Sequence, residues 1–349
     1  MRKWLIDYLK CYLCGSDFKI DSRVESKDEI YEGFLNCRCS SFPIINGIPR
    51  MLQKKFQPSI LEQYPNFAAK YGYNLNNGKK SNSQSKTMRS FGYEWTHFDT
   101  EYEVYAEQFR DWIHPITRSQ LKEKTVLDAG CGTGIHSRLL EGYGARVISV
   151  DFSSAVEVAY DKARSLKNIS VIQADIAQLP LKNRFDYIFS IGSLHHMNDP
   201  KKGIISMRSK LKNRGILFLK VYSKECNFLT INLIEGIIKK MTSLISFHYL
   251  NLICFLFVIP FSLILFSYVL LSMISPNLSS KLPYYDYFLV VSKYSFRHKH
   301  NIIFDILSAP VVHYYSKSEL KSLLSGLNIK HISGYKLLSW RVIAEYEKA

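Results

Sequence analysis

The chain is short of acidic side chains and lacks an apolar leader at its start. Its 349 residues include 30 Asp and Glu against 46 Lys and Arg, which gives a formal charge of +16. That excess favours anionic surroundings such as phospholipid head groups, phosphorylated substrates or nucleic acid, although basic residues scattered over solvated faces give the same total. Residues 1–10 lack the apolar core and the small-residue cleavage site of a secretory signal, so a cytoplasmic location is expected.

Cysteine is sparse as well. Seven cysteines in a reducing compartment argue against a disulfide framework and favour metal ligands or unligated thiols. Four of them form two pairs with a polar stretch between them, Cys11-x-x-Cys14 and Cys37-x-Cys39. Such pairs suit tetrahedral thiolate coordination of zinc in a segment too small to fold on its own core. Four unligated cysteines are the alternative.

A dinucleotide-binding fingerprint is absent, because Gly-x-Gly-x-x-Gly would require glycine where Ile135 stands. The chain has instead Gly130, Gly132 and Gly134, closely preceded by Asp128. Glycines at such a turn permit positive φ angles and let a ligand lie directly against the main chain. The helix that follows would present unpaired N–H groups to it.

The surroundings of these glycines support a nucleotide-like ligand. Residues 125–129 are an apolar, β-branched run that predicts a buried strand, and 135–142 predict a helix. A second predicted strand, 146–150, ends at Asp151. At that distance a carboxylate accepts hydrogen bonds from two ribose hydroxyls.

The glycine loop resembles motif I of class I S-adenosylmethionine-dependent methyltransferases, and the likeness continues along the chain. Residues 170–175, 185–190 and 211–221 resemble the third, fourth and fifth strands of that family, closest to its quinone-biosynthesis group. The resemblance implies a doubly wound, seven-stranded Rossmann-like α/β sheet that binds S-adenosylmethionine. It implies a donor site made of Asp128, Gly130, Gly132, Gly134, Asp151, Phe152, Asp175, Ile176 and Ser190.

The same family often carries an N-terminal zinc ribbon, and residues 42–52 resemble the end of that module. Its metal ligands here would be Cys11, Cys14, Cys37 and Cys39, although the second pair is one residue shorter than usual. The expected division of the chain is a ribbon at 1–55, a linker and helical segment at 56–123, the methyltransferase core at 124–222, a hydrophobic helical insert at 223–300 and the last strands at 301–349.

Two segments lie between ribbon and core. Residues 74–86 are a polar run without periodicity, which predicts a linker or mobile loop. Residues 90–98 are an aromatic cluster that resembles one preceding the core in the same family. One interpretation places Tyr93 or Trp95 over the donor, where an aromatic face favours a sulfonium charge. The other is packing of an amphipathic helix against the sheet.

His195 and His196, directly after the predicted fourth strand, are the predicted catalytic residues. Methyl transfer depends mainly on alignment of the two reactants, and a base is needed only if the acceptor must lose a proton. A near-neutral imidazole can take a hydroxyl proton, and this loop borders the substrate pocket in doubly wound folds. The alternative is that the pair only shapes the pocket.

Residues 241–280 contain no Lys, Arg, Asp or Glu, and 250–274 are almost wholly Leu, Ile, Phe and Val around Pro260. The run is longer than the ~20 residues of a membrane-spanning helix. A single crossing would place the last two expected strands, 329–332 and 341–345, across the bilayer from the rest of the sheet.

Three arrangements of the insert therefore stay open. They are a re-entrant or interfacial hairpin broken at Pro260, a double crossing with 228–238 as the second arm, and an apolar cap buried by protein. Charged residues in and beside that arm disfavour the double crossing. Lysines and tyrosines flank the run and resemble an interfacial rim, so membrane contact through 241–280 is predicted.

An apolar insert on the substrate side indicates a hydrophobic, quinone-like or lipid-linked acceptor. The expected function is methyl transfer from S-adenosylmethionine to a small molecule or lipid-linked glycan at the inner face of the membrane. An RNA base methyltransferase is an alternative that the charge and the ribbon favour. A long uncharged insert suits a phosphate backbone poorly, so nucleic acid is not the expected partner. The other alternative, a noncatalytic S-adenosylmethionine-binding protein, is disfavoured by the intact acids and glycines.

Overall fold

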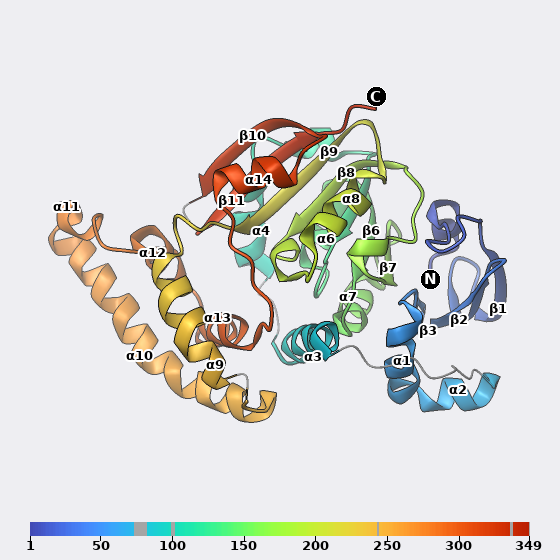
Figure 1. Ribbon diagram of the computed structural model, residues 1–349, viewed down its shortest axis with the longest axis horizontal. Coiled ribbons are helices and arrows are strands. Elements are labelled where there is room, and N and C mark those ends of the chain that lie inside the picture. Colours follow the sequence, from blue (N-terminus) through green and yellow to red (C-terminus); the bar gives the residue numbers. More distant parts are fainter. Residues whose placement is uncertain (73–81, 99–101, 243, 336–337, 349) are drawn as a thin grey trace.

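Two β-sheets and their surrounding helices make up the structure, a computed structural model (Figure 1). It describes residues 1–72, 82–98, 102–242, 244–335 and 338–348. Most of the predicted linker at 74–86 lies outside these residues. Its last part, residues 82–86, is described and forms the start of a helix, so the linker prediction is wrong there.

The larger sheet contains the strands β5 (Thr125–Ala129), β6 (Arg146–Asp151), β7 (Ile169–Gln173), β8 (Phe185–Ile191), β9 (Leu211–Tyr222), β10 (Asn328–Tyr335) and β11 (Ser339–Glu345). Their order is β10-β11-β9-β8-β5-β6-β7. Strands β5 to β9 are parallel, whereas β11 is antiparallel to both β9 and β10. This confirms the predicted doubly wound, seven-stranded α/β sheet.

Helices cover both faces of this sheet. They are α4 (Tyr102–Ile113), α5 (Arg118–Leu121), α6 (Ile135–Gly142), α7 (Ala155–Ala163), η3 (Ile176–Gln178), η4 (Leu194–His196), α8 (Pro200–Arg208) and α14 (Lys317–Leu323). Successive strand residues point to opposite faces. Val126 of β5 therefore packs in one core with Phe109 of α4, and Leu127 in a second core with Leu320 of α14. The strands are apolar runs because both of their faces are buried.

The ribbon is a four-stranded antiparallel sheet preceded by a short helix. Its elements are η1 (Lys3–Tyr8), β1 (Lys19–Glu25), β2 (Ile30–Asn36), β3 (Ser41–Ile45) and β4 (Ile48–Pro49). Leu5 belongs to the same apolar core as Leu127 of the large sheet. Arg50 is fully buried, with Nη2 2.5 Å from Oε1 of Glu157 in α7, and it donates to the side chain of Gln173 at 3.1 Å. The ribbon and the larger sheet thus share one core.

Four helices connect the ribbon to the core: η2 (Lys54–Phe56), α1 (Gln57–Gln63), α2 (Pro65–Tyr71) and α3 (Asn82–His97). Helix α3 packs against α7 at Gly92, where an added Cβ would lie 2.5 Å from Oγ of Ser154. Its other side meets the insert, since Ser90 Oγ donates to the carbonyl of Ser308 at 3.0 Å. Helix α3 therefore bridges the core and the insert.

The insert between β9 and β10 is helical. It contains η5 (Thr230–Ile238), α9 (Lys239–Thr242), α10 (Phe247–Ile274), α11 (Pro276–Ser279), α12 (Tyr285–Ser292) and α13 (Phe296–Ser308). Helix α10 is continuous with Pro260 inside it, so the alternative of a hairpin broken at Pro260 does not hold. Before the proline, Phe255 packs on Phe296 of α13 at 5.1 Å, and after it Tyr268 packs on Phe288 of α12 at 4.8 Å. Packing on both sides offsets the ~3 kcal/mol that an interior proline costs a helix.

Helix α10 extends away from the body of the protein (Figure 1). Among the described residues it is the one helix long and apolar enough, by length and composition, to cross a membrane. Only 17% of its most apolar 18-residue stretch is buried, which disfavours the alternative of a cap buried by protein. A single crossing conflicts with the sheet, because β9 and β11 flank the insert and pair with each other. Helix η5, with nine residues, is well short of the ~20 needed for a second crossing.

Candidate functional site

The glycine loop joins the end of β5 to the start of α6. Gly130, Gly132 and Gly134 have φ angles of 85°, 51° and 74°, a region that residues with a Cβ rarely adopt. At Gly130 space is lacking too, since a Cβ would lie 2.2 Å from the Cβ of Ser193. The loop therefore presents bare main chain at the N-terminus of α6.

Asp128, Gly134 and Ser190 are not among the cavity-lining residues and lie behind the loop. Asp128 accepts a hydrogen bond from Ser137 Oγ at 2.6 Å, and burial raises the pKa of its carboxyl to about 7. Ser190 Oγ is 2.7 Å from Ser193 Oγ, which donates to the carbonyl at the end of β5 at 2.8 Å. These contacts fix the loop, and direct contact of the three residues with a donor stays a prediction.

A cavity of about 470 Å³ opens at the carboxyl ends of the strands, where doubly wound folds bind ligands. Asp151 lines it at the end of β6. Its Oδ2 accepts from the N–H of Gly132 at 2.9 Å, and its Oδ1 accepts from the N–H and the hydroxyl of Ser153 at 2.8 and 2.7 Å. Burial raises the pKa of this carboxyl, and the three hydrogen bonds oppose that rise. Part of its acceptor capacity remains for a ribose hydroxyl.

Asp175 occupies the corresponding place after β7. Its Oδ1 accepts from the N–H of Ala177 at 2.9 Å, and its Oδ2 accepts from the side-chain amide of Gln53 at 3.2 Å. Burial raises the pKa of this carboxyl. Phe152 and Ile176 line the cavity beside the two acids. Gln53 was not anticipated, because it comes from the segment after the ribbon and no local pattern links it to a distant strand.

The two predicted catalytic histidines occupy different environments. His195 is 1% exposed, lies outside the cavity lining, and has both ring nitrogens buried without a hydrogen-bond partner in the part of the chain that the structure describes. His196 lines the cavity, and its Nδ1 lies 2.9 Å from the carbonyl of Val311. That contact places the proton on Nδ1 and leaves Nε2 as an acceptor. Burial lowers the pKa of His196 to about 4 and that of His195 well below its usual range. Catalysis by either residue stays a prediction.

Helix α3 supplies aromatic side chains to the cavity wall. Phe91 and Trp95 line the cavity, and the Trp95 ring lies 3.5 Å from the Cβ position of Gly132. Tyr93 packs instead in the core of the insert, with its ring 5.7 Å from that of Phe247. Trp95 therefore has the place of an aromatic that faces a sulfonium, whereas Tyr93 follows the packing interpretation.

The polar residues of the cavity wall that were not predicted include Lys220 and Tyr222 of β9 and Asp305 of α13. The Lys220 ammonium lies 4.2 Å from the ring centroid of Trp112, and burial lowers its pKa to about 8. The sequence does carry a signal for Lys220, because a charged residue inside an apolar strand is unusual, and for Tyr222, because it ends that strand. Asp305 stands in a helix of the insert and carries no comparable signal.

The residues present fit S-adenosylmethionine. Asp151 and Asp175 offer carboxylates for ribose hydroxyls and an adenine amino group. The main chain at Gly132 is bare, and Trp95 lies beside it. Bound there, S-adenosylmethionine supplies a methyl group already activated by positive sulfur.

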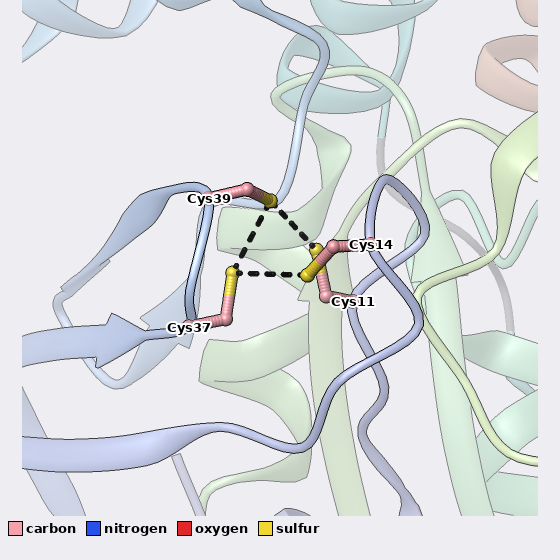
Figure 2. A group of neighbouring side chains, drawn as sticks. All are labelled: Cys11, Cys14, Cys37 and Cys39. Carbon is pink, nitrogen blue, oxygen red and sulfur yellow. Dashed lines mark hydrogen bonds between the residues drawn. The ribbon is translucent and has the colours of Figure 1, made fainter.

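Four cysteine thiols converge at one end of the ribbon (Figure 2). The Sγ–Sγ distances are 3.7 Å for Cys11–Cys39, 4.0 Å for Cys14–Cys37 and 3.6 Å for Cys37–Cys39. A tetrahedral zinc with ~2.3 Å Zn–S bonds places its sulfurs roughly 3.8 Å apart. The short second pair therefore does not prevent convergence, and the cluster fits the predicted zinc ribbon. Zinc itself stays a prediction.

Comparison with known proteins places a family match over the centre of the chain. Residues 127–219 match the family described as "Methyltransferase domain". A tRNA U34 carboxymethyltransferase from Shewanella loihica is 33% identical over 132 residues, 35% of this chain and 38% of that protein. One from Aliivibrio salmonicida is 34% identical over 128 residues, 35% and 39% of the two chains. The chain thus aligns with less than half the length of these relatives.

Solved structures of similar topology include two methyltransferases. Magnesium protoporphyrin IX methyltransferase from Synechocystis PCC 6803 is 15% identical, with a TM-score of 0.41 over 83% of this chain and 100% of that one. A SAM-dependent methyltransferase from Aquifex aeolicus is 17% identical, with a TM-score of 0.38 over 76% and 99%.

Proposed function

We propose that this chain, whose residues 127–219 are a methyltransferase domain, transfers a methyl group from S-adenosylmethionine to a hydrophobic or lipid-linked acceptor at the cytoplasmic face of a membrane. The donor half of the proposal depends on the bare glycine loop and the two acids of the cavity. The acceptor half depends on one observation, the exposed apolar surface of α10.

That surface is a stripe of large side chains at helical spacing, which we call the apolar stripe. Its members are each about half exposed or more: Leu252, Leu256, Ile259, Leu263, Phe266, Leu270 and Met273. The stripe runs for roughly 30 Å along the helix. The opposite side of α10 is buried at Leu250, Cys254, Val258 and Leu265. A contiguous apolar surface of this length marks an interaction site.

Its occupant, we propose, is a bilayer that contains anionic lipids. Helix α10 has no charged residue, whereas exposed basic residues stand beside it at Lys281, Lys293 and Arg297. An apolar surface flanked by cations matches an acyl layer beneath anionic head groups. The same insert also contributes Asp305 to the cavity wall, so a docked insert would hold the cavity close to the lipid surface.

Donor binding is tested by calorimetry with S-adenosylmethionine. We expect saturable binding to the wild type and at least a hundredfold loss in Gly130→Ala, because the added Cβ meets Ser193. Gly142→Ala is the matched control, since it has open space and should bind as the wild type does. A wild type that does not bind the compound contradicts the donor half.

Acceptor class is tested by sedimentation with phosphatidylglycerol vesicles and by transfer of a tritiated methyl group into a lipid extract. We expect the protein to pellet with anionic vesicles more than with phosphatidylcholine, and label to enter the lipid fraction. Protein that stays wholly in the supernatant would contradict membrane contact.

A second candidate function is modification of RNA. It is favoured by the names of the curated relatives, tRNA U34 carboxymethyltransferases, and by the charge of +16. Binding of bulk tRNA that weakens steeply with added salt, together with transfer of label into RNA and not into lipid, would favour this function.

A further inference from the structure

The insert contributes a carboxyl group to the cavity. Asp305 of α13 lines the same cavity as the glycine loop, His196 and Tyr222. Helix α13 is held there by its neighbours, since Phe304 is fully buried against Tyr93 of α3 at 5.6 Å between ring centroids. The position of Asp305 in the cavity is therefore fixed by packing on α3.

Ionisable groups surround Asp305 from every neighbouring element. They are Tyr222 of β9, Lys239 of α9, Glu94 of α3, Tyr287 of α12 and Tyr314 before α14. Tyr222 is placed to donate a hydrogen bond to the Asp305 carboxyl. Its ring lies 4.0 Å from that of His195, which keeps the tyrosine from turning away. The carboxyl is thus oriented by a residue of the sheet.

Glu94 sets the charge state of this group. It is fully buried, and neither of its oxygens has a hydrogen-bond partner among the described residues. Burial and the nearby Asp305 carboxyl both raise the pKa of Glu94 well above its usual range. Two close carboxyls in a buried site do not both ionise readily, so Glu94 keeps its proton and Asp305 carries the charge. Burial raises the pKa of Asp305 to about 6.

This carboxyl suits proton abstraction near neutral pH better than the imidazole of His196. A general base works best when its pKa lies close to the working pH. Asp305 meets this condition at about 6, whereas His196 at about 4 is a weaker base and Lys220 at about 8 is mostly protonated. His196 and Tyr222 then shape the cavity around the acceptor.

We propose that Asp305 is the general base of the methyl transfer and that the acceptor carries a hydroxyl group. The acceptor oxygen forms its bond to the methyl carbon, the carbon–sulfur bond breaks with its electron pair left on sulfur, and the O–H proton passes to Asp305 Oδ. The proton leaves to water when the products are released. An acceptor carboxylate would need no base, so this class is excluded. The inference depends on the proposed methyltransferase function.

One test needs no acceptor. An ionised Asp305 attracts a sulfonium but not a thioether, so the affinity of S-adenosylmethionine relative to S-adenosylhomocysteine should rise between pH 5 and pH 7.5. We expect a rise of about tenfold, the size of one screened charge pair inside a protein. The rise should be several-fold smaller in Asp305→Asn than in the wild type, and Asp305→Glu should keep the full rise. His196 stays neutral and Lys220 stays largely charged across this range. Asp128, Asp151 and Asp175 also have raised pKa values, and their contribution to the rise is the same in all three proteins.

Asp161→Asn is the control for this experiment. Asp161 is an exposed carboxylate of α7 that pairs with Arg164 and lies outside the cavity lining, so its loss should not affect the rise. A rise of equal size in Asp305→Asn and the wild type would overturn the inference while leaving donor binding intact. Absence of donor binding in the wild type would instead overturn the proposed function and this inference with it.

Transfer to the acceptor is the second measurement. With whichever fraction the wild type labels, lipid or RNA, Asp305→Asn should lower kcat about a hundredfold or more and leave the Kd for S-adenosylmethionine within a few fold. Asp305→Glu should recover part of the rate. Near-normal kcat in Asp305→Asn would overturn the inference even if the affinity ratio behaves as expected.

Discussion

The ribbon and the insert are both additions to the same sheet, yet they join it in opposite ways. The ribbon shares its apolar core with the sheet and buries Arg50, which pairs with the partly exposed Glu157, at the junction. The insert anchors one helix, α13, and leaves α10 largely exposed. Surface that is buried inside the chain stabilises the fold, whereas apolar surface left exposed is available to a partner. We therefore propose a structural role for the ribbon and a binding role for the insert.

The metal cluster gives the strongest test of this contrast. Cys37→Ser, or removal of metal with a chelator, should lower the free energy of unfolding of the whole protein by about 5 kcal/mol or more, because bound zinc contributes directly to folding. Thermal unfolding and zinc analysis of the purified protein measure it. Cys226→Ser is the control, since Cys226 is exposed and outside the cluster. Zinc-free protein with an unchanged melting temperature would contradict the metal site.

The junction of ribbon and core should show the next largest effect. Arg50→Met removes the buried donor of the Gln173 side chain and the Ile45 carbonyl and leaves the partly exposed Glu157 unpaired, so we expect a loss of about 2–3 kcal/mol in urea unfolding. Arg23→Met breaks the exposed pair of Arg23 with Asp21 in the same ribbon and should cost less than about 1 kcal/mol. Similar losses for the two variants would mean that ribbon and sheet do not share a core.

Glu94 makes stability depend on pH where core and insert meet. The folded chain keeps the proton on Glu94, whereas the unfolded chain loses it above the usual pKa of 4.5. Stability should therefore fall as pH rises from 4.5 until the folded carboxyl ionises. Glu94→Gln should make this slope shallower and be more stable at pH 8 by at least about 1.4 kcal/mol, the equivalent of one pKa unit. The other buried carboxyls with raised pKa values, such as Asp128 and Asp305, keep the rest of the slope. Glu107→Gln, at an exposed glutamate, should change neither the pH slope nor the stability at pH 8. A Glu94→Gln variant with the same pH slope as the wild type would contradict the assignment of a buried, protonated Glu94.

The apolar stripe should show the smallest effect on stability and the largest on binding. Leu256→Gln with Leu263→Gln should change the free energy of unfolding by less than about 1 kcal/mol, because both side chains are exposed. Binding to anionic vesicles should fall at least tenfold. Leu250→Ala, on the buried side of α10, should leave vesicle binding unchanged and lower the free energy of unfolding by about 2–5 kcal/mol. Unchanged vesicle binding in the double variant would assign the lipid contact to another surface.

The sheet and the donor end of the cavity could be predicted from sequence because their signals are local. Buried parallel strands are continuous apolar runs, and the acids that follow them meet at one edge of the sheet. Gln53 and Asp305 were not predicted as cavity residues, because contacts between residues a hundred or more positions apart produce no periodic pattern in the sequence. Pro260 suggested a break in the apolar segment, but packing of α10 on α12 and α13 outweighs the tendency of proline to interrupt a helix.

Gln53 links the two halves of the molecule in one further respect. The segment that follows the ribbon contacts the donor pocket, through Gln53 at Asp175 and through the Phe56 ring, 4.8 Å from that of Phe152, and Lys55 also lines the cavity. Removal of the metal from the ribbon should therefore loosen these contacts and weaken the binding of the nucleoside. Thermodynamic linkage makes such an effect reciprocal, so a saturating nucleoside should in turn tighten the retention of zinc.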